Sequence, residues 1–238
     1  MSEQLRNILF DFFGTLVEYS PSRTEQGYDR SHRLVSSFGS RLDYDAFLSL
    51  WSAVSEELDQ MANHDLSEFS MHDAAAQFLR RAIDRRPTER MIDAFVKTYI
   101  REWNAGVRYL DGLTQFLGRL KPRFRLGIVT NTHLAALVED HLVRMDAPSH
   151  FDVVVTSIAE GRRKPHPQIF LRALELLGAG SAETLFVGDS YEADYLGARR
   201  VGMNCFLIDP SQNARVPPEH RISDLFELER RLPIELTR

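Results

Sequence analysis

The sequence predicts an α/β fold in which helices cover a parallel sheet and a second, helical region interrupts it. Short apolar runs that end in small or polar residues are typical of buried parallel strands. Segments with a helical repeat of apolar residues separate these runs, and that alternation predicts a parallel sheet with right-handed crossovers. One long stretch, residues 18–108, breaks the alternation because it carries helical repeats and no convincing strand.

Five runs are predicted to be the strands of the sheet. Strands buried on both faces need apolar side chains at successive positions, and each run supplies them. The last run contains Cys205, the only cysteine, which is therefore expected in the core and can form no internal disulfide. The predicted strands are residues 7–11, 126–130, 151–156, 184–189 and 204–208.

Helices are predicted between the strands, where apolar residues recur every three or four positions. Gly178 directly follows the last of these repeats and is a good helix stop. The three repeats are Leu113, Phe116, Leu117 and Leu120; Leu134, Leu137, Val138 and Leu142; and Ile169, Phe170, Ala173, Leu174 and Leu177.

The interrupting segment is predicted to be a separate helical domain, residues 18–108, whose apolar stripes pack into a core of their own. The remaining residues, 1–17 and 109–238, form the sheet domain. An insertion after the first strand is expected near the carboxyl ends of the strands, where ligands of open α/β sheets bind. Its stripes are Phe47, Leu50, Trp51, Val54, Leu58 and Met61; Phe78 and Leu79; and Ile92, Phe95, Val96, Tyr99, Ile100 and Trp103.

Composition excludes several classes of protein. The 238 residues include 29 Lys and Arg and 34 Asp and Glu, a net charge of −5, which excludes a broadly basic surface for coating nucleic acid. No apolar run approaches the roughly 20 residues that span a bilayer. The N-terminus lacks the layout of a signal peptide, and no dinucleotide fingerprint or P-loop occurs. We expect a cytoplasmic protein with neither nucleic-acid nor membrane partners.

Side chains able to do chemistry stand where the predicted strands end. Asp11 closes the first strand, Thr130 the second, and Asp189 the fourth, with Asp194 five residues later. Lys164, one of only three lysines, lies before Pro165. Because the carboxyl ends of parallel strands meet at one sheet edge, these groups are expected to converge.

This set of groups suits transfer of a group through a covalent aspartyl intermediate. The carboxylate of Asp11 is a competent nucleophile when nearby charges balance it. Carboxylate oxygens of Asp11 and Asp189 are the hard ligands that Mg²⁺ prefers. Lys164 and Thr130 offer positive charge and a hydrogen bond where the oxygens of a transferring phosphoryl group gain charge.

With these motifs in this order and spacing, the chain resembles the haloacid dehalogenase (HAD) superfamily over its whole length. The resemblance implies a Rossmann-like core, residues 1–17 and 109–238, and a helical cap domain, residues 18–108. It also implies an Mg²⁺-dependent hydrolase, for which we expect a small phosphate monoester as substrate.

The same resemblance implies a role for each motif residue. Asp11 is the nucleophile, while Thr130 and Lys164 bind the phosphoryl group and Lys164 also steadies Asp11. Thr15, as a supporting hydroxyl, and Asn131 complete the predicted phosphate-binding set. The predicted metal ligands are Asp11, the backbone carbonyl of Phe13, Asp189, and Asp194, the last directly or through water.

One position departs from the commonest pattern of the family. Its phosphatases usually carry a second aspartate two residues after the nucleophile, as general acid and base, and here that position is Phe13. Proton transfer by a placed side chain is typically worth about 10²–10⁴-fold in rate. Without it, both the departure of the leaving group and hydrolysis of the aspartyl intermediate should slow.

Three explanations of Phe13 remain open. The first is a phosphatase with slow turnover or a substitute acid and base, for which Glu18, His133 and His166 are candidates. The second is a dehalogenase, because 2-haloacid dehalogenases carry an aromatic residue at this place and a departing halide needs no proton. Those enzymes work without metal, however, whereas Asp189 and Asp194 favour phosphate chemistry. The third is a binding or regulatory protein that has lost catalysis.

Overall fold

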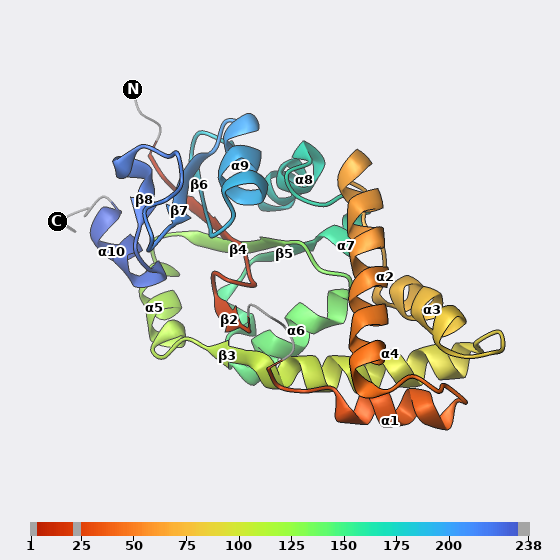
Figure 1. Cartoon of the computed structure of the whole chain (residues 1–238). Coiled ribbons are helices and arrows are strands. Elements are labelled where there is room, and N and C mark those ends of the chain that lie inside the picture. Colours follow the sequence, from red (N-terminus) through yellow and green to blue (C-terminus); the bar gives the residue numbers. More distant parts are fainter. Residues whose placement is uncertain (1–3, 21–24, 233–238) are drawn as a thin grey trace. The chain divides into compact units, whose positions relative to one another are not determined.

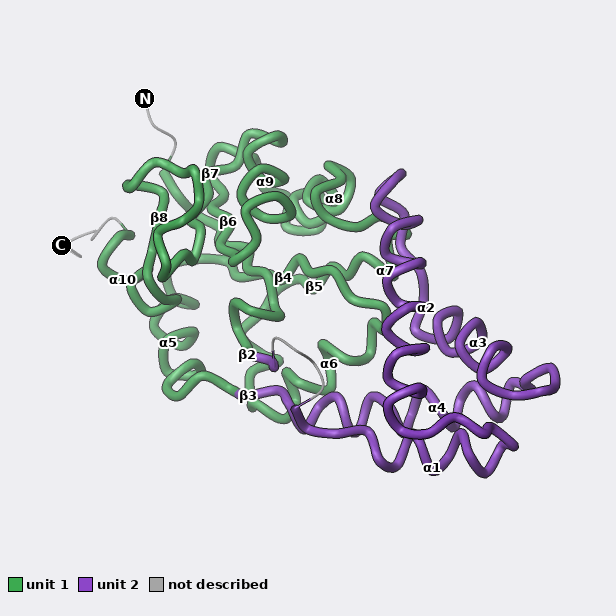
Figure 2. Tube along the Cα trace, in the orientation of Figure 1, with its two compact units in different colours: residues 1–18, 109–238 green, residues 19–108 purple. Residues whose placement is uncertain are grey.

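The computed structural model describes residues 4–20 and 25–232, and the chain divides into two compact units. One unit, here the sheet unit, comprises Met1–Glu18 and Tyr109–Arg238. The other, the helical unit, comprises Tyr19–Arg108 (Figure 2). Each unit has its own hydrophobic core among the described residues.

The sheet unit is built on a six-stranded sheet with the order β5-β4-β1-β6-β7-β8 (Figure 1). All five strand pairings are parallel, and central β1 pairs with both β4 and β6. Renumbered along the chain, this order is the 3-2-1-4-5-6 of doubly wound folds, which reverses between β1 and β6. The strands are β1 (Asn7–Phe10), β4 (Arg125–Thr130), β5 (Val153–Thr156), β6 (Thr184–Gly188), β7 (Asn204–Ile208) and β8 (Arg221–Ile222).

Helices of the sheet unit bury their apolar stripes against these strands. The helix α8 packs against β4 and β5, and begins with Pro167 in its first turn and ends at Gly178 in the left-handed conformation. All three predicted helices are present. The helices are α5 (Leu113–Leu120), α6 (Ala135–Arg144), α7 (Ser157–Glu160), α8 (Pro167–Leu177), α9 (Gly197–Arg200) and α10 (Leu228–Arg231), with shorter turns η2 (Pro148–His150), η4 (Pro218–His220) and η5 (Leu225–Glu227) and a π-helical turn, η3 (Tyr191–Leu196).

The helical unit packs around aromatic side chains. Phe78 and Phe95 stack at 5.1 Å between ring centroids, and Trp51 lies against both. Side-chain caps begin three of its helices, including a reciprocal capping box between Ser70 and Asp73. The unit contains α1 (Asp29–Ser37), α2 (Tyr44–Asp65), α3 (Met71–Ala82), α4 (Glu89–Trp103) and the turn η1 (Asn104–Gly106).

Two short strands correct the expectation that residues 18–108 contain no strand. The strands β2 (Val17–Tyr19) and β3 (Val107–Tyr109) form a two-stranded sheet, and the boundaries of the units fall within them. Three residues are too few to display the alternation by which a strand is recognised in sequence.

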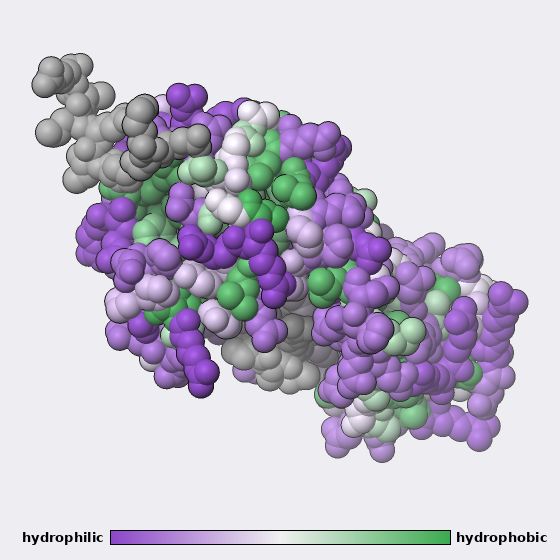
Figure 3. Space-filling view, turned by 90° about the horizontal axis from the view of Figure 1, so that it is seen from above, coloured by the Kyte–Doolittle hydropathy of each residue, from purple (hydrophilic) through white to green (hydrophobic). Residues whose placement is uncertain are grey.

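The described surface is mostly hydrophilic, as Figure 3 shows for one face. Some apolar residues, such as Met61, Val143 and Leu171, are nevertheless exposed, which is normal for a folded protein. Among the described residues, the structure contains no helix that is both long and apolar enough to cross a membrane.

Candidate active site

The predicted nucleophile lies at the point where the strand order of the sheet reverses. Asp11 directly follows β1, and Asp189 directly follows β6, its neighbour in the sheet. Thr130 ends β4 on the other side of β1 and is 1% exposed. Ligands of doubly wound folds bind at this reversal, outside the carboxyl ends of the strands.

Lys164 joins this edge from the loop between α7 and α8. Its ammonium Nζ donates to Oδ1 of Asp11 at 2.7 Å and to Oδ1 of Asp194 at 2.6 Å. The side chains of Lys164 and Asp194 are 2% and 1% exposed, and that of Asp11 is 10% exposed. Two carboxylates thus share one buried positive charge, so the site carries an excess of negative charge.

That excess shifts the pKa values of the group. Burial alone would lower the pKa of Lys164, but the charges of Asp11 and Asp194 raise it to about 12, so its ammonium stays protonated. Burial raises the pKa of Asp194 to about 6, helped by Asp11 and opposed by Lys164. The pKa of Asp189 is raised to about 7, mainly because its carboxyl group is partly shielded from water and secondly because of the negative charges of Asp11 and Asp194.

Two glycines allow the carboxylates to approach the strand ends so closely. Gly14 has a φ of +90°, and a Cβ added there would meet Cγ of Asp189 at 2.8 Å. A Cβ added at Gly188 would meet Cβ of Asp194 at 2.6 Å. Any larger residue at either position would displace an acidic side chain from the site.

Asp194 is held by hydrogen bonds through both of its carboxylate oxygens. Oδ1 accepts from Lys164, while Oδ2 accepts from the backbone N–H of Ser190 at 2.9 Å. The π-helical turn η3 brings Asp194 back toward Ser190, whose hydroxyl caps the same turn. Asp189 is the more exposed carboxylate, and Oγ1 of Thr15 donates to it at 3.5 Å.

The acidic residues fit a divalent cation by their chemistry. Asp11, Asp189 and Asp194 each offer a carboxylate oxygen within 4.8 Å of the others. Only oxygen donors are present in this set, as Mg²⁺ prefers, and one ammonium does not balance three carboxylates. Coordination of the metal by the backbone carbonyl of Phe13 stays a prediction.

Asn131, predicted to bind phosphate, uses its side chain to hold the backbone of Lys164. Oδ1 of Asn131 accepts from the Lys164 N–H at 2.7 Å, and Nδ2 donates to the Lys164 carbonyl at 3.1 Å. The side-chain amide therefore fixes the loop that carries the ammonium group. Phosphate binding by Asn131 stays a prediction.

The side chain of Phe13 lies in an aromatic group that sequence reasoning missed. Its ring contacts Phe12 at 4.9 Å and His141 at 6.1 Å between centroids, both edge to face. Nδ1 of buried His141 is hydrogen-bonded to the hydroxyl of Tyr109 at 2.8 Å. Burial, and then the charge of Arg144, lower the pKa of His141 to about 4, so the ring is neutral at pH 7.

The candidate substitutes for the missing acid differ in their surroundings. Nδ1 of His166 accepts from the N–H of Gln168 at 3.2 Å and so caps α8. Glu18 is exposed and His133 is partly exposed. Proton transfer by any of the three stays a hypothesis.

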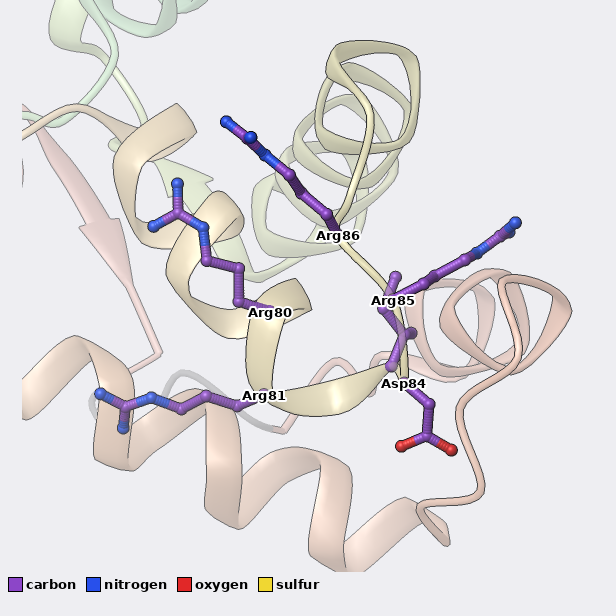
Figure 4. A pocket seen from close by; sticks show the side chains of 6 residues that line it. Arg80, Arg81, Asp84, Arg85 and Arg86 are labelled. Carbon is purple, nitrogen blue, oxygen red and sulfur yellow. The ribbon is translucent and has the colours of Figure 1, made fainter.

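A cavity in the helical unit is built from basic residues after α3. Its volume is about 680 Å³, and Arg81 there is paired with Glu57 at 2.6 Å. Figure 4 shows the side chains of Arg81 and Arg85 pointing in opposite directions, so these two charges do not converge on one point. Its lining residues are Arg80, Arg81, Ile83, Asp84, Arg85 and Arg86.

Comparison with known families gives a match over most of the chain. A model of haloacid dehalogenase-like hydrolases matches residues 5–202. The bovine haloacid dehalogenase-like hydrolase domain-containing protein 3 is 40% identical over 117 residues, 47% of this chain, and the chain spans about half of that protein, 46%. A glyceraldehyde 3-phosphate phosphatase of Pyrococcus abyssi is 29% identical over 200 residues, 84% of this chain and 79% of that protein.

Solved structures share the fold at low sequence identity. A 2-haloacid dehalogenase of Pseudomonas syringae superposes with a TM-score of 0.75 at 19% identity, over 96% of this chain and 98% of that chain. The magnesium-bound HAD-hydrolase YfnB of Bacillus subtilis gives a TM-score of 0.67 at 21% identity, over 98% of this chain and all of that one, 100%. At such identities the likeness extends to the fold alone.

Proposed function

Because the chain belongs to the haloacid dehalogenase-like hydrolases, we propose that it is a phosphatase that hydrolyses a small phosphate monoester through an aspartyl-phosphate on Asp11. The observation that carries the proposal is the buried group in which Lys164 bridges Asp11 and Asp194 beside Asp189. The phosphatase from Pyrococcus abyssi, similar over most of its length, supports it.

In the proposed reaction, Asp11 supplies the attacking carboxylate oxygen. Lys164 orients that carboxylate and, with the hydroxyl of Thr130, stabilises the charge that builds on the phosphoryl oxygens. Burial of Thr130 and Lys164 strengthens both interactions by excluding water from around them. Asn131 acts through Lys164, because its side-chain amide holds both the backbone N–H and the backbone carbonyl of Lys164 in place.

Mg²⁺ is the proposed cofactor. Asp11 and Asp189 would hold it with the backbone carbonyl of Phe13, and Asp194, whose two oxygens already accept hydrogen bonds, would act through a bridging water. When bound, the ion supplies positive charge that offsets the carboxylates and the substrate phosphate.

We also propose that residues 18–108 form a separate domain that selects the substrate and that the protein works in the cytoplasm.

Dehalogenation is the competing candidate, and Phe13 is the observation that favours it. The phenyl ring of Phe13 cannot donate a proton to the alkoxide oxygen that leaves from an alkyl ester, whereas a halide leaves without needing a proton. Against it stand Asp189 and Asp194, because their carboxylates suit a divalent cation and 2-haloacid dehalogenases work without metal.

A panel of phosphate esters and 2-haloacids, each assayed with Mg²⁺ and with chelator, separates the candidates. Release of phosphate that stops with chelator supports the phosphatase. Release of halide despite chelator would replace it with the dehalogenase. If neither phosphate nor halide is released, the protein would be a binding protein. A rise in melting temperature on addition of ligand would then test for binding.

A further inference from the structure

The π-helical turn η3 carries Asp194, and its hydrogen bonds differ from those of an α-helix. The backbone N–H groups of Asp194 and Tyr195 both donate to the Ser190 carbonyl, at 3.0 and 3.1 Å. The second of these bonds spans five residues instead of four, which is the π register. In this register Oδ2 of Asp194 accepts from the N–H of Ser190, and Oδ1 accepts from Lys164. The place of the carboxylate in the site therefore depends on the register of the turn.

Tyr195, the residue after Asp194, fastens this turn to the C-terminal part of the sheet unit. Its side chain is buried, and its hydroxyl is hydrogen-bonded to Nδ1 of His220 at 2.7 Å. The ring also stacks on that of Tyr191, at 5.9 Å between centroids. A π-helical turn is a rare conformation, so contacts from outside the turn are needed to maintain it.

Building on the proposed function, we propose that Tyr195 and His220 are positioning residues of this site. Their hydrogen bond holds η3 in the π register, and this register holds the carboxylate of Asp194 beside Lys164 and the proposed Mg²⁺ ion.

His220 is suited to this role because the chain on each side of it is held in place. The flanking residues are Glu219 and Arg221, and Nη2 of Arg231 donates to both of their backbone carbonyls, at 3.0 and 3.1 Å. The Arg231 guanidinium also lies 5.6 Å from the centre of the Phe206 ring in β7. The tyrosine hydroxyl thus meets a partner whose backbone is fixed to α10 and to the sheet.

Loss of the hydrogen bond allows η3 to relax toward the ordinary α register. In that register the N–H of Tyr195 bonds to the carbonyl of Tyr191, four residues before it. The change moves the Asp194 carboxylate relative to Lys164, which then keeps only Asp11 of its two carboxylate partners. Mg²⁺ binding should weaken because one of three carboxylates is displaced, and kcat should fall because the ammonium group is no longer held from both sides.

The test is the affinity of the full chain for Mg²⁺, measured by calorimetry without substrate, together with kcat for an aryl phosphate. Tyr195→Phe removes the hydroxyl and keeps the ring on Tyr191, whereas His220→Ala removes the partner of the hydroxyl. Each should weaken Mg²⁺ binding about 10-fold, the lower end of what loss of an outer group around a metal site costs, and should lower kcat. His220→Gln keeps a group that can hydrogen-bond the hydroxyl and should recover part of the affinity.

Two further variants separate positioning from general stability. The double variant of Tyr195→Phe and His220→Ala should lose no more affinity than either single variant, because each already breaks the same bond. Tyr44→Phe removes a hydroxyl that accepts from the N–H of Tyr28 at 2.8 Å in the helical unit, so it should lower the melting temperature and leave Mg²⁺ affinity unchanged. Melting temperatures show which variants are folded during the titration, and Tyr195→Phe decides the inference if His220→Ala is not.

The outcomes separate the inference from the proposed function. Unchanged Mg²⁺ affinity in folded Tyr195→Phe, with only a lower melting temperature, overturns the inference and leaves the phosphatase standing. A loss of about 100-fold in the double variant also overturns it, because additive losses mean that the two side chains act independently. A wild-type chain that neither binds Mg²⁺ nor hydrolyses phosphate esters overturns the proposed function, and the inference with it.

Discussion

The single ammonium group of Lys164 is shared by two buried carboxylates, those of Asp11 and Asp194, and this arrangement sets what each acidic residue can do. Breaking a buried ion pair by removing one partner typically costs about 3–5 kcal/mol, because the remaining charge stays buried. Asp11 is held by this pairing, Asp194 is held on both oxygens, and Asp189 is the most exposed of the three. The residues therefore call for different tests.

For the nucleophile, Asp11→Asn should abolish turnover. The amide keeps an oxygen that accepts from Lys164 but lacks the charge that attacks phosphorus, so the fold should survive while activity is lost. Phosphate release by freshly purified protein is the measurement, with mass spectrometry to exclude deamidation. Asp111→Asn, at an exposed carboxylate, is the matched control and should keep full activity. Retained activity in Asp11→Asn would disprove the covalent mechanism.

For the metal, Asp189→Ala should weaken Mg²⁺ binding and phosphatase activity together. Two hard carboxylates at neighbouring strand ends are the reason, and removal of one leaves a poorer set of ligands. Calorimetric titration with Mg²⁺ measures the affinity, and Asp84→Ala in the helical unit provides the control. Unchanged Mg²⁺ affinity in Asp189→Ala would show that Asp189 is not a ligand.

At the scale of elements, the site depends on four loops that meet at one sheet edge: those after β1, β4 and β6, and the loop between α7 and α8. The strands β1, β4 and β6 end within one residue of Asp11, Thr130 and Asp189, and this convergence follows from parallel pairing in register. Asn131, after β4, ties its loop to the one between α7 and α8. The position of the ammonium group is thus fixed from two directions.

Loss of the two hydrogen bonds between Asn131 and Lys164 should reduce catalysis without removing any charge. Asn131→Ala deletes both hydrogen bonds to Lys164, at a cost of about 1–3 kcal/mol in stability, and a misplaced ammonium group can lower kcat by up to about 10²-fold. Asn204→Ala, which deletes a hydrogen bond to Ala182 on the surface, is the control. A fall in kcat with unchanged KM is expected. A rise in KM alone would instead place Asn131 at the substrate.

Long apolar elements and motif residues could be predicted from the sequence, and short or tertiary features could not. Each of the five predicted strands and three predicted helices of the sheet unit is present, with ends shifted by up to two residues. The two-residue β8 is too short to show a period, and α1 carries only two apolar residues, Leu34 and Val35, so it shows no apolar repeat. The contact between Phe13 and His141 joins residues that no sequence spacing connects.

At the scale of the whole molecule, the buried neutral His141 makes stability depend on pH. Its folded pKa of about 4 lies below the ordinary value of 6.5, so the unfolded chain binds a proton more readily than the folded one. The contribution of the neutral His141 ring to the free energy of unfolding is fully present above about pH 6.5 and is lost as the pH falls toward 4. The loss amounts to at most about 3 kcal/mol.

The melting temperature between pH 7.5 and 4.5 tests this dependence. Wild type should lose more stability on acidification than His141→Gln, which has no proton to gain, although the variant starts lower because it loses ring packing. His72→Gln, at an exposed histidine, should follow wild type. Equal pH dependence in wild type and His141→Gln would contradict the assignment of a buried neutral ring.

The central place of β1 in the sheet has a consequence for synthesis of the chain. Asn7 pairs with Arg125 on one side and Thr184 on the other, so the strand that precedes Asp11 has no partner in this sheet until more than half of the chain has been made. The helical unit, whose contacts are local, can be complete well before that. The proposed nucleophile is therefore made early and positioned late, and a nascent chain that stops before β6 carries Asp11 but not the site.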